Sequence, residues 1–448
     1  MIHAFTFDGT DIVLDVNSGA VHVVDELALH VIRDYETLPE ENLAQKYAPV
    51  YGPAAVREVL QEVRELKKRG LLFAPDPLPE GYRPPEEDTV KALCLHLAHD
   101  CNLRCRYCFA GQGDFGGDRG LMSPEVGRAA IDFLMAASGD RRHVEVDFFG
   151  GEPLLNRRVL VDLVHYGNKR ARQAGKEIKF TLTTNALLLD GEMRQFIGDY
   201  GLAVVLSIDG RPEVHDRMRP FPSGAGSYQQ VMENVSRFVH SPHCGEYYIR
   251  GTFTRYNLDF TEDVRHLAEA GFQSISLEPV VAGAGCDYAL REEDVPVLLA
   301  EYDKLTRYLL ERRRQGRPVE FFHFIIDLEE GPCLPKRLTG CSAGQEYLAV
   351  TPAGDLYPCH QFVGRPGFRM GNVFNGKAGK NSANLFQKAH IYNKSACGQC
   401  WAKFFCSGGC HANALAFNGD LLKPYHLGCL LARKRLECAL YLEAIARQ

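Results

Sequence analysis

Apolar and polar positions in the middle of the chain follow two periods in turn. Short apolar runs predict strands, and stretches with helical spacing lie between them, for example at 123–137 and 157–174. The predicted strands are residues 91–97, 143–149, 178–184, 202–208, 247–254 and 273–279. Such an alternation predicts an α/β fold with a parallel sheet, either an open doubly wound sheet or a barrel. In a barrel, chemistry gathers where the strands end.

The first 80 residues follow a different pattern. Short strands are predicted at 3–7, 11–15 and 19–24, and helices follow, the clearest running from Pro53 to Gly70. Three strands and three helices predict a winged-helix-like unit, a shape used by DNA-binding domains. Residues 1–80 hold 14 acidic and 7 basic side chains, a net charge of −7. Because a duplex binder needs cations, this charge disfavours DNA and favours a peptide-binding or docking role.

Two changes of composition divide the rest of the chain. Residues 74–88, "APDPLPEGYRPPEED", contain five prolines and predict a linker. From residue 333 the periodicity weakens, and eight of the 15 cysteines lie between Cys333 and Cys429. A region with so little apolar pattern needs metal ligation to hold it together. We therefore expect three domains, at 1–80, 89–315 and 333–448.

Overall composition narrows the class of protein. The chain has 448 residues, of which 45% are hydrophobic and 24% charged, as is usual for globular proteins. The first residues, "MIHAFTFDGT", lack the pattern of a secretory signal, and no apolar run would span a bilayer. We therefore expect a cytoplasmic location, where cysteines are more often metal ligands than disulfides. Four cysteines fall outside every motif and are predicted to be small buried residues: Cys94, Cys244, Cys286 and Cys438.

The first predicted barrel strand leads into a loop with three cysteines, "HDCNLRCRYCFAG". Cys101, Cys105 and Cys108 can hold three corners of an iron–sulfur cube, which leaves one iron open to a small molecule. A zinc site with His99 as the fourth ligand is the alternative. It is disfavoured, since zinc sites usually combine two separated pairs of ligands.

This loop resembles the C-x₃-C-x₂-C signature of radical S-adenosylmethionine (SAM) enzymes, with Tyr107 in the aromatic position. The resemblance implies a partial (β/α)₆ barrel, a catalytic [4Fe–4S] cluster on the three cysteines, and SAM bound to the open iron. In that family SAM is cleaved to methionine and a 5′-deoxyadenosyl radical, which removes a hydrogen atom from the substrate. The positions implied to contact SAM are Gly150, Gly151 and Glu152 of "FFGGEPLL", and Asn185, Ser207, Asp209 and Arg219.

The C-terminal cysteines form a second pattern. Cys397, Cys400, Cys406 and Cys410 have the spacing C-x₂-C-x₅-C-x₃-C; upstream, Cys341 and Cys359 frame Gly354; Cys429 follows. The pattern resembles the SPASM domain, which adds two auxiliary [4Fe–4S] clusters to a radical SAM barrel; a double zinc site is the alternative. The resemblance places Cys341, Cys359 and Cys410 on the nearer cluster, and Cys397, Cys400, Cys406 and Cys429 on the distal cluster. Either Cys333 or a substrate thiolate completes the nearer cluster.

The subfamily is indicated by "NSGAVHVVD" and "GDLYPCHQFVG", which resemble the maturases of six-cysteine (SCIFF) peptides. Those enzymes join a cysteine sulfur to a carbon of another residue, often threonine, in a ribosomal precursor peptide. Their N-terminal unit binds that peptide, and here the hairpin at 11–24 offers an edge for an added strand. The resemblance implies a flavodoxin or ferredoxin as the electron donor. It implies no nucleic acid and no membrane as a partner.

Three alternatives remain open at this point. Sulfatase maturases carry a basic aspartate after the second cysteine of the upstream frame, where this chain has His360, so formylglycine formation is doubtful. Amine dehydrogenase maturases and peptide epimerases share the same domains. A non-catalytic zinc scaffold that binds peptides is the alternative of a different class.

Overall fold

The structure is a computed structural model of the chain, and it describes residues 1–77, 89–328, 334–377 and 385–446. Most of the predicted linker and Cys333 lie outside the described residues. The six strands predicted for the middle of the chain all form, and neighbouring strands pair in parallel in chain order. They are β4 (Ala92–Ala98), β5 (His143–Gly150), β6 (Glu177–Thr184), β7 (Ala203–Ser207), β8 (Tyr247–Phe253) and β9 (Ser274–Pro279).

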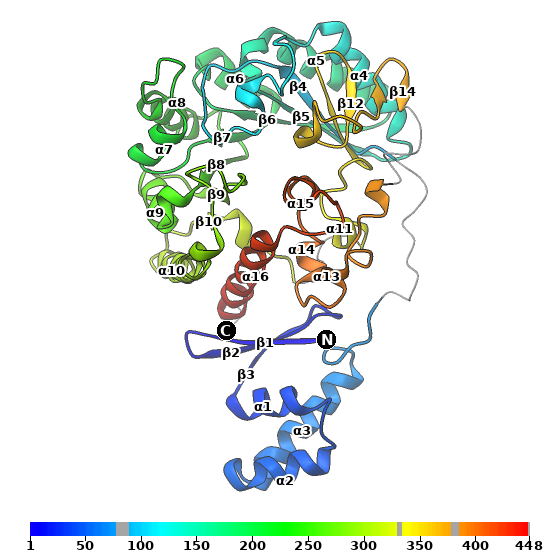
Figure 1. Cartoon of the computed structure of the whole chain (residues 1–448), viewed down its shortest axis with the longest axis vertical. Coiled ribbons are helices and arrows are strands. Elements are labelled where there is room, and N and C mark those ends of the chain that lie inside the picture. The colour runs from blue at the N-terminus through cyan, green and yellow to red at the C-terminus, as the bar shows by residue number, and fades with distance from the viewer. Residues whose placement is uncertain (78–88, 329–333, 378–384, 447–448) are drawn as a thin grey trace.

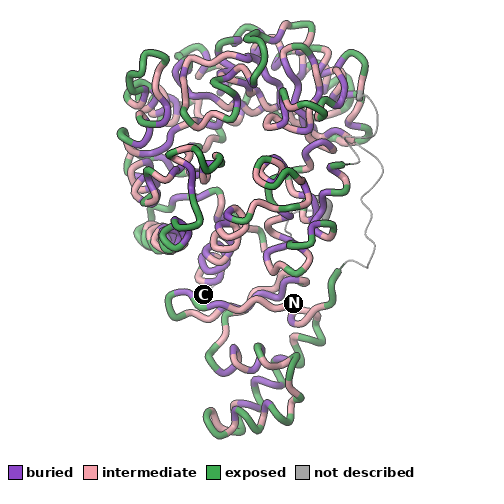
Figure 2. The backbone as a smooth tube through the Cα atoms, in the orientation of Figure 1, coloured by how far each residue is buried: buried purple, intermediate pink, exposed green. Residues whose placement is uncertain are grey.

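Helices follow the strands and cover the outer face of this sheet, so the sheet curves into an open arch (Figure 1). They are α4 (Pro124–Ala137), α5 (Arg157–Gln173), α6 (Gly191–Tyr200), α7 (Pro212–Met218), α8 (Tyr228–Val239), α9 (Phe260–Glu269) and α10 (Val295–Arg314). Side-chain caps set some of the helix starts: Asp190 accepts a hydrogen bond from the backbone N–H of Met193 at 2.9 Å. Buried residues are frequent along the strands and helices of this part of the chain (Figure 2). Leu93, Phe148 and Leu182 belong to the main hydrophobic core and are 0% exposed.

The parallel sheet continues beyond both of its predicted edges. A short strand, β10 (Glu320–Phe321), pairs in parallel with β9, and at the other edge β11 (Tyr347–Val350) pairs in parallel with β4. The antiparallel strands β12 (Asp355–Tyr357), β13 (Gly371–Asn372) and β14 (Gly376–Lys377) complete a sheet of 11 strands. The C-terminal cysteine-rich region is therefore built onto the first barrel strand, which fixes Cys359, just after β12, relative to the barrel.

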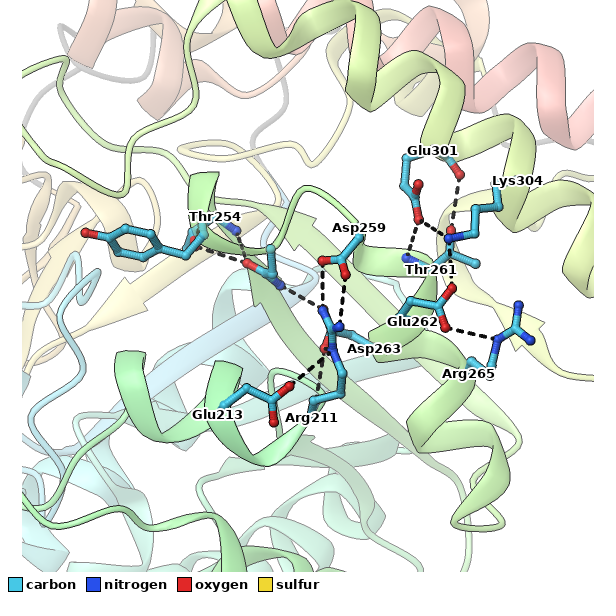
Figure 3. Close-up of polar contacts among 12 residues, drawn as sticks. Arg211, Glu213, Thr254, Asp259, Thr261, Glu262, Asp263, Arg265, Glu301 and Lys304 are labelled. Carbon is cyan, nitrogen blue, oxygen red and sulfur yellow. Dashed lines mark hydrogen bonds and ion pairs between the residues drawn. The ribbon is translucent and has the colours of Figure 1, made fainter.

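The turn after β7 is held by a network of charged side chains (Figure 3). Gly210 has φ +130°, and a Cβ there would lie 2.3 Å from the Cβ of Asp263, so only glycine fits beside α9. Arg211 donates to Asp259 at 2.8 and 2.9 Å and to Asp263 at 2.9 Å. Asp263 is 0% exposed, so this is a buried pairing. It anchors the end of β7, where Asp209 lies, to α9.

The N-terminal unit is a three-stranded antiparallel sheet followed by three helices, as predicted. The elements are β1 (Ile2–Phe7), β2 (Thr10–Asp15), β3 (Val21–Val24), α1 (Glu26–Asp34), α2 (Glu40–Tyr51) and α3 (Pro53–Lys68). Side chains of β2 alternate between two cores: Val13 packs with the three helices, whereas Ile12 and Leu14 belong to the main core of the protein. The sheet thus lies between its own helices and the C-terminal helix α16 (His426–Ala446) (Figure 1).

Specific contacts join this sheet to the C-terminal region. The ring of His3 stacks on Trp401 with centroids 3.6 Å apart, and Phe7 stacks on Tyr441 at 4.3 Å. Asp76, just before the undescribed linker residues, accepts a hydrogen bond from Lys403 at 2.8 Å and another from Tyr392 at 2.7 Å. The linker sequence suggests a loosely attached unit, but these contacts fix the N-terminal unit against the rest of the chain.

The four cysteines outside the motifs divide into two kinds. Cys94 and Cys438 are buried, as predicted. The prediction is wrong for Cys244 and Cys286, which are partly exposed because they lie in turns after α8 and after β9. Within the described residues, no helix combines the length and the apolar character needed to cross a membrane.

Candidate active site and cysteine groups

The three-cysteine loop follows β4 and lies at the carboxyl ends of the barrel strands. A cavity of about 150 Å³ opens beside it. Its lining includes, of the residues singled out in the sequence, Cys101, Cys105, Tyr107, Cys108, Gly150, Gly151, Glu152, Asn185, Ser207 and Arg219. Residues that are up to 118 positions apart in the sequence are thus brought to one site, since parallel strands present their carboxyl ends at the same edge.

Burial favours the protonated form of two thiols of this loop, those of Cys101 and Cys105. Burial raises the pKa of Cys101 to about 12 and that of Cys105 to about 11. Nearby Glu152 raises the pKa of Cys101 further, while the guanidinium of Arg219 opposes the shift at both thiols. Cluster binding must therefore release protons here, as is usual when a metal replaces thiol protons.

The glycines of the "FFGGEP" turn let two strand ends approach each other. Gly150 has φ +128°, and a Cβ on it would lie 2.3 Å from the carbonyl oxygen of Ala98. A Cβ on Gly151 would lie 2.1 Å from the carbonyl oxygen of Asp100. The backbone N–H of Gly151 donates to Ala98 at 2.8 Å. The two glycines thus form a narrow cradle beside the cysteine loop, because a side chain at either position would collide with the neighbouring backbone.

Glu152 ties this turn to the end of the next strand. Its carboxylate accepts hydrogen bonds from the hydroxyl of Thr184 at 2.8 Å and the backbone N–H groups of Asn185 at 2.8 Å and Leu154 at 3.0 Å. The side chain is 1% exposed, and burial raises its pKa while these bonds oppose the shift. The amide of Asn185 in turn donates to Asn102 at 2.7 Å, so the end of β6 also contacts the cysteine loop.

Tyr107, Asp209 and Arg219 form a buried cluster under the loop. The hydroxyl of Tyr107 lies 2.8 and 2.7 Å from the two carboxylate oxygens of Asp209, and Arg219 donates to Tyr107 at 3.0 Å. The resemblance implied a direct ligand contact for Asp209. In the structure this residue is 0% exposed, also accepts from the backbone N–H of Thr252 at 3.1 Å, and lies behind Tyr107, away from the cavity lining.

These residues fit the cluster and SAM in two respects. First, the Nε of Arg219 is buried, has no hydrogen-bond partner among the described residues, and belongs to a side chain that lines the cavity, so it is available to a carboxylate such as that of SAM. Second, three thiols from one loop face a cradle in which backbone can approach a ligand closely. Ser207 also lines the cavity.

Three of the C-terminal cysteines form a group beside this site, which we call the near group: Cys341, Cys359 and Cys410. Burial raises the pKa of Cys359 to about 12, and the thiols of the other two add to the shift, which shows that the three lie within electrostatic reach. The ring of His360, next to Cys359, packs near two phenylalanine rings. Its centroid lies 5.3 Å from that of Phe109 and 5.0 Å from that of Phe149. Because Phe109 directly follows Cys108, the near group adjoins the three-cysteine loop.

The other four cysteines form the distal group: Cys397, Cys400, Cys406 and Cys429. Burial raises the pKa of Cys397 to about 11, with contributions from each of the other three thiols. The sequence analysis assigned these seven cysteines to two ligand sets, and that assignment stays a prediction. It missed Lys394, a fully buried lysine between the near and distal groups, and Trp401, which stacks on His3. A lysine in a loop carries no sequence signal of burial.

Two family models match parts of the chain. Residues 95–241 match the model of the radical SAM superfamily, and residues 341–401 match SPASM, an iron–sulfur cluster-binding domain. The chain therefore contains a radical SAM domain and a SPASM domain. Its cofactors are SAM and a [4Fe–4S] cluster in the barrel and further iron–sulfur clusters in the SPASM domain, in place of the zinc alternatives.

Sequence relatives cover different parts of the chain. The PqqA peptide cyclase of Rhodopseudomonas palustris is 27% identical over 340 residues, 73% of this chain and 84% of that protein. An uncharacterized protein of Methanocaldococcus jannaschii is 29% identical over 192 residues, 43% of this chain and 63% of that protein.

Solved structures agree in fold. Native anSMEcpe with bound AdoMet has a TM-score of 0.67 and 21% identity over 80% of this chain and 99% of that one. Streptococcus suis SuiB bound to the precursor peptide SuiA has a TM-score of 0.53 and 16% identity over 95% of this chain and 98% of that one. The α/β partial barrel predicted from the sequence is thus confirmed.

Proposed function

We propose that this protein is a radical SAM peptide maturase that forms intramolecular thioether crosslinks in a ribosomally synthesised, cysteine-rich precursor peptide. The bond joins a cysteine sulfur to a carbon of another residue, with threonine as the expected acceptor. The domain composition and the peptide-directed relatives support peptide modification as the reaction class. The thioether itself is supported by the arrangement of the near group.

The observation that carries the proposal is the exposure of two near-group cysteines. Cys341 and Cys410 are exposed and line a cavity of about 640 Å³ that runs from the end of β9 to α16. Three near-group cysteines lie in the described residues, and a cubic cluster has four irons. We propose that a peptide thiolate entering this cavity occupies the fourth position, with Cys333 as the alternative ligand.

The overall reaction removes two hydrogens from the peptide for each bond formed. One hydrogen leaves the carbon as an atom and ends on 5′-deoxyadenosine; the thiol hydrogen leaves as a proton, and one electron is released. When bound, the cofactors supply the radical and an acceptor for that electron. The chain itself positions SAM, through the Arg219 guanidinium and the Gly150–Gly151 cradle, and keeps the thiol close to the site of hydrogen removal.

The N-terminal unit is proposed to hold the leader of the peptide. Within the described residues β3 pairs with β2 alone, so its outer edge can accept an extended strand. The similarity to SuiB extends over 95% of this chain, so it includes this unit. A flavodoxin or ferredoxin is the proposed electron donor, and the cytoplasm the proposed location.

The ligand sets proposed from the sequence predict three [4Fe–4S] clusters, that is about twelve irons per chain. They assign Cys101, Cys105 and Cys108 to the SAM cluster, the near group to one auxiliary cluster and the distal group to the other. Iron and sulfide analysis of the anaerobically reconstituted chain checks this number. About four irons would leave the SPASM cysteines without clusters.

The activity is tested by anaerobic reaction of the full chain with a short cysteine-rich peptide that carries a leader sequence, followed by mass spectrometry. We expect a loss of two hydrogens per crosslink and no crosslink when every peptide cysteine is alkylated beforehand. A crosslink that survives alkylation would instead indicate a carbon–carbon bond, and a product of unchanged mass would indicate epimerisation. Cys359→Ala should stop crosslinking while SAM cleavage continues, whereas the matched variant Cys286→Ala, outside every group, should leave both intact.

A further inference from the structure

Lys394 is a lysine that the fold buries completely. It precedes α13 (Ser395–Gly398), is 0% exposed, and its Nζ donates to the carbonyl oxygen of Gly408 at 2.8 Å. The turn that receives it consists of Ser407, Gly408 and Gly409, with φ of +56°, +83° and +72°. A Cβ on Gly408 would lie 2.9 Å from the lysine Nζ. The turn between Cys406 and Cys410 is therefore shaped around the ammonium group.

The groups around this ammonium come from both cysteine groups. Burial lowers the pKa of Lys394, and the thiols of Cys397 and Cys406 in the distal group and of Cys341 and Cys410 in the near group oppose that shift. Cys429, His390 and His411 also interact with it electrostatically. In the part of the chain that the structure describes, no carboxylate forms an ion pair with Lys394.

A buried ammonium without a carboxylate partner is strongly unfavourable unless other negative charge compensates it. Cysteine ligands supply such charge, because a thiol that binds metal is deprotonated. The surroundings of Lys394 are therefore suited to a state in which both groups carry metal-bound thiolates, and a single cation faces the two sets together.

We propose that Lys394 is a charge bridge between the two auxiliary clusters, which raises the reduction potential of both. The inference rests on the ligand sets of the proposed function. Reduction adds negative charge to a cluster, so a cation held beside its sulfur ligands favours the reduced form. A cation shared by both clusters would shift both reduction potentials in the same direction. Lys394 is a positioning and tuning residue and contacts no substrate.

The test measures reduction potentials. The auxiliary clusters are isolated by replacing Cys101, Cys105 and Cys108 with alanine in the full chain, and their potentials are measured by redox titration with electron paramagnetic resonance. The variants are Lys394→Met, which removes the charge, Lys394→Gln, which keeps a hydrogen-bond donor for Gly408, and Lys394→Arg, which keeps the charge. Lys388→Met is the matched control, since Lys388 is exposed on the same segment.

Lys394→Met and Lys394→Gln should each lower the reduction potentials of both auxiliary clusters by at least about 59 mV. This shift corresponds to about a tenfold change in a one-electron equilibrium constant. Lys394→Arg and Lys388→Met should leave both near the unaltered values. If Lys394→Met and Lys394→Gln lose iron while Lys394→Arg keeps it, assembly of the auxiliary clusters itself requires the positive charge, which also supports the proposal. Unchanged potentials in loaded Lys394→Met, a shift of one cluster alone, or equal iron loss in Lys394→Arg would overturn the bridge.

The iron content of the unaltered chain separates this proposal from the one on which it rests. About twelve irons with unchanged potentials in Lys394→Met would refute the bridge and leave the ligand sets standing. Fewer than two auxiliary clusters in the unaltered chain would refute the ligand sets, and the bridge with them.

Discussion

Replacing Gly151 with alanine tests whether the close approach at the "FFGGEP" turn is needed for SAM binding. The new Cβ would lie 2.1 Å from the carbonyl oxygen of Asp100, whereas ordinary contact begins at 3.4 Å. The two backbone segments would thus have to separate by about 1.3 Å. That movement strains two buried hydrogen bonds, Gly151 N–H to Ala98 at 2.8 Å and Glu152 N–H to Asp100 at 2.9 Å.

The expected effect follows from these two bonds and from the displacement. Losing both would destabilise the turn by roughly 2–6 kcal/mol, because each buried group left unpaired costs about 1–3 kcal/mol. A shift of about 1 Å in positioning groups typically lowers a rate about 100-fold. We therefore expect Gly151→Ala to lower the rate of 5′-deoxyadenosine formation by about 100-fold and to weaken SAM binding measured by anaerobic equilibrium dialysis.

The matched control is Gly120→Ala, in the loop that leads from the cysteines to α4. Gly120 has no atom within 4 Å of a built Cβ and no positive φ, so its variant should bind and cleave SAM normally. Iron content and Tm are measured for both variants, so that a protein that has lost its cluster is recognised. SAM cleavage within about twofold of normal by iron-loaded Gly151→Ala would refute the reasoning, and so would equal losses in the two variants.

Three further predictions follow from the buried contacts. Arg219→Met removes the free Nε and the bond to Tyr107, so SAM should bind about 10- to 100-fold more weakly by dialysis, with partial recovery in Arg219→Lys. Burial raises the pKa of Asp209 to about 6 from 3.8, so the folded state binds more protons at this carboxyl than the unfolded state between about pH 4 and 6. This carboxyl alone should lower the free energy of unfolding by about 3 kcal/mol as the pH rises through that window, and add no further change above it. Denaturant titrations of Asp209→Asn should therefore show a flatter pH profile than those of the unaltered chain, and an equally steep profile would contradict the assignment. Removing residues 1–85 should lower the Tm of the remainder by several degrees, because it uncovers Tyr441 and Trp401; an unchanged Tm would show that the unit is independent.

Much of the fold is readable from the sequence because the signals are local. Each barrel strand is a short apolar run with helical stretches on either side, and each cluster loop fixes its cysteines by spacing along the chain. The pairing of β11 with β4 carries no such signal. Residues 347–350 form a short apolar stretch, and only the tertiary fold decides that this stretch joins the barrel sheet about 250 positions away.

What the sequence could not predict at the candidate site also depends on the tertiary fold. Asp209 and Ser207 lie at the end of one strand, and sequence alone gives both the same ligand-binding prediction. The structure separates them, since Ser207 lines the cavity and Asp209 lies behind Tyr107 with its oxygens already bonded. In a regular strand two residues at this spacing would face the same side, but β7 ends at Ser207 and Asp209 lies in the turn beyond it, so the side that Asp209 faces depends on the tertiary fold. Lys394 was missed for a related reason, because a buried lysine and an exposed one look alike in a loop sequence.

The two-sided N-terminal sheet has a consequence for protein engineering. A designer who exchanges residues 1–77 to redirect the protein to another peptide also replaces Ile12 and Leu14 of the main core and the partners of Trp401 and Tyr441. A chimera that receives a foreign N-terminal unit but keeps its own α16 would therefore have mismatched packing between the two. That contact includes Trp401, which lies beside Cys400 of the distal group. Productive exchanges should transplant the N-terminal unit together with the residues it contacts on α16 and in the loop around Trp401.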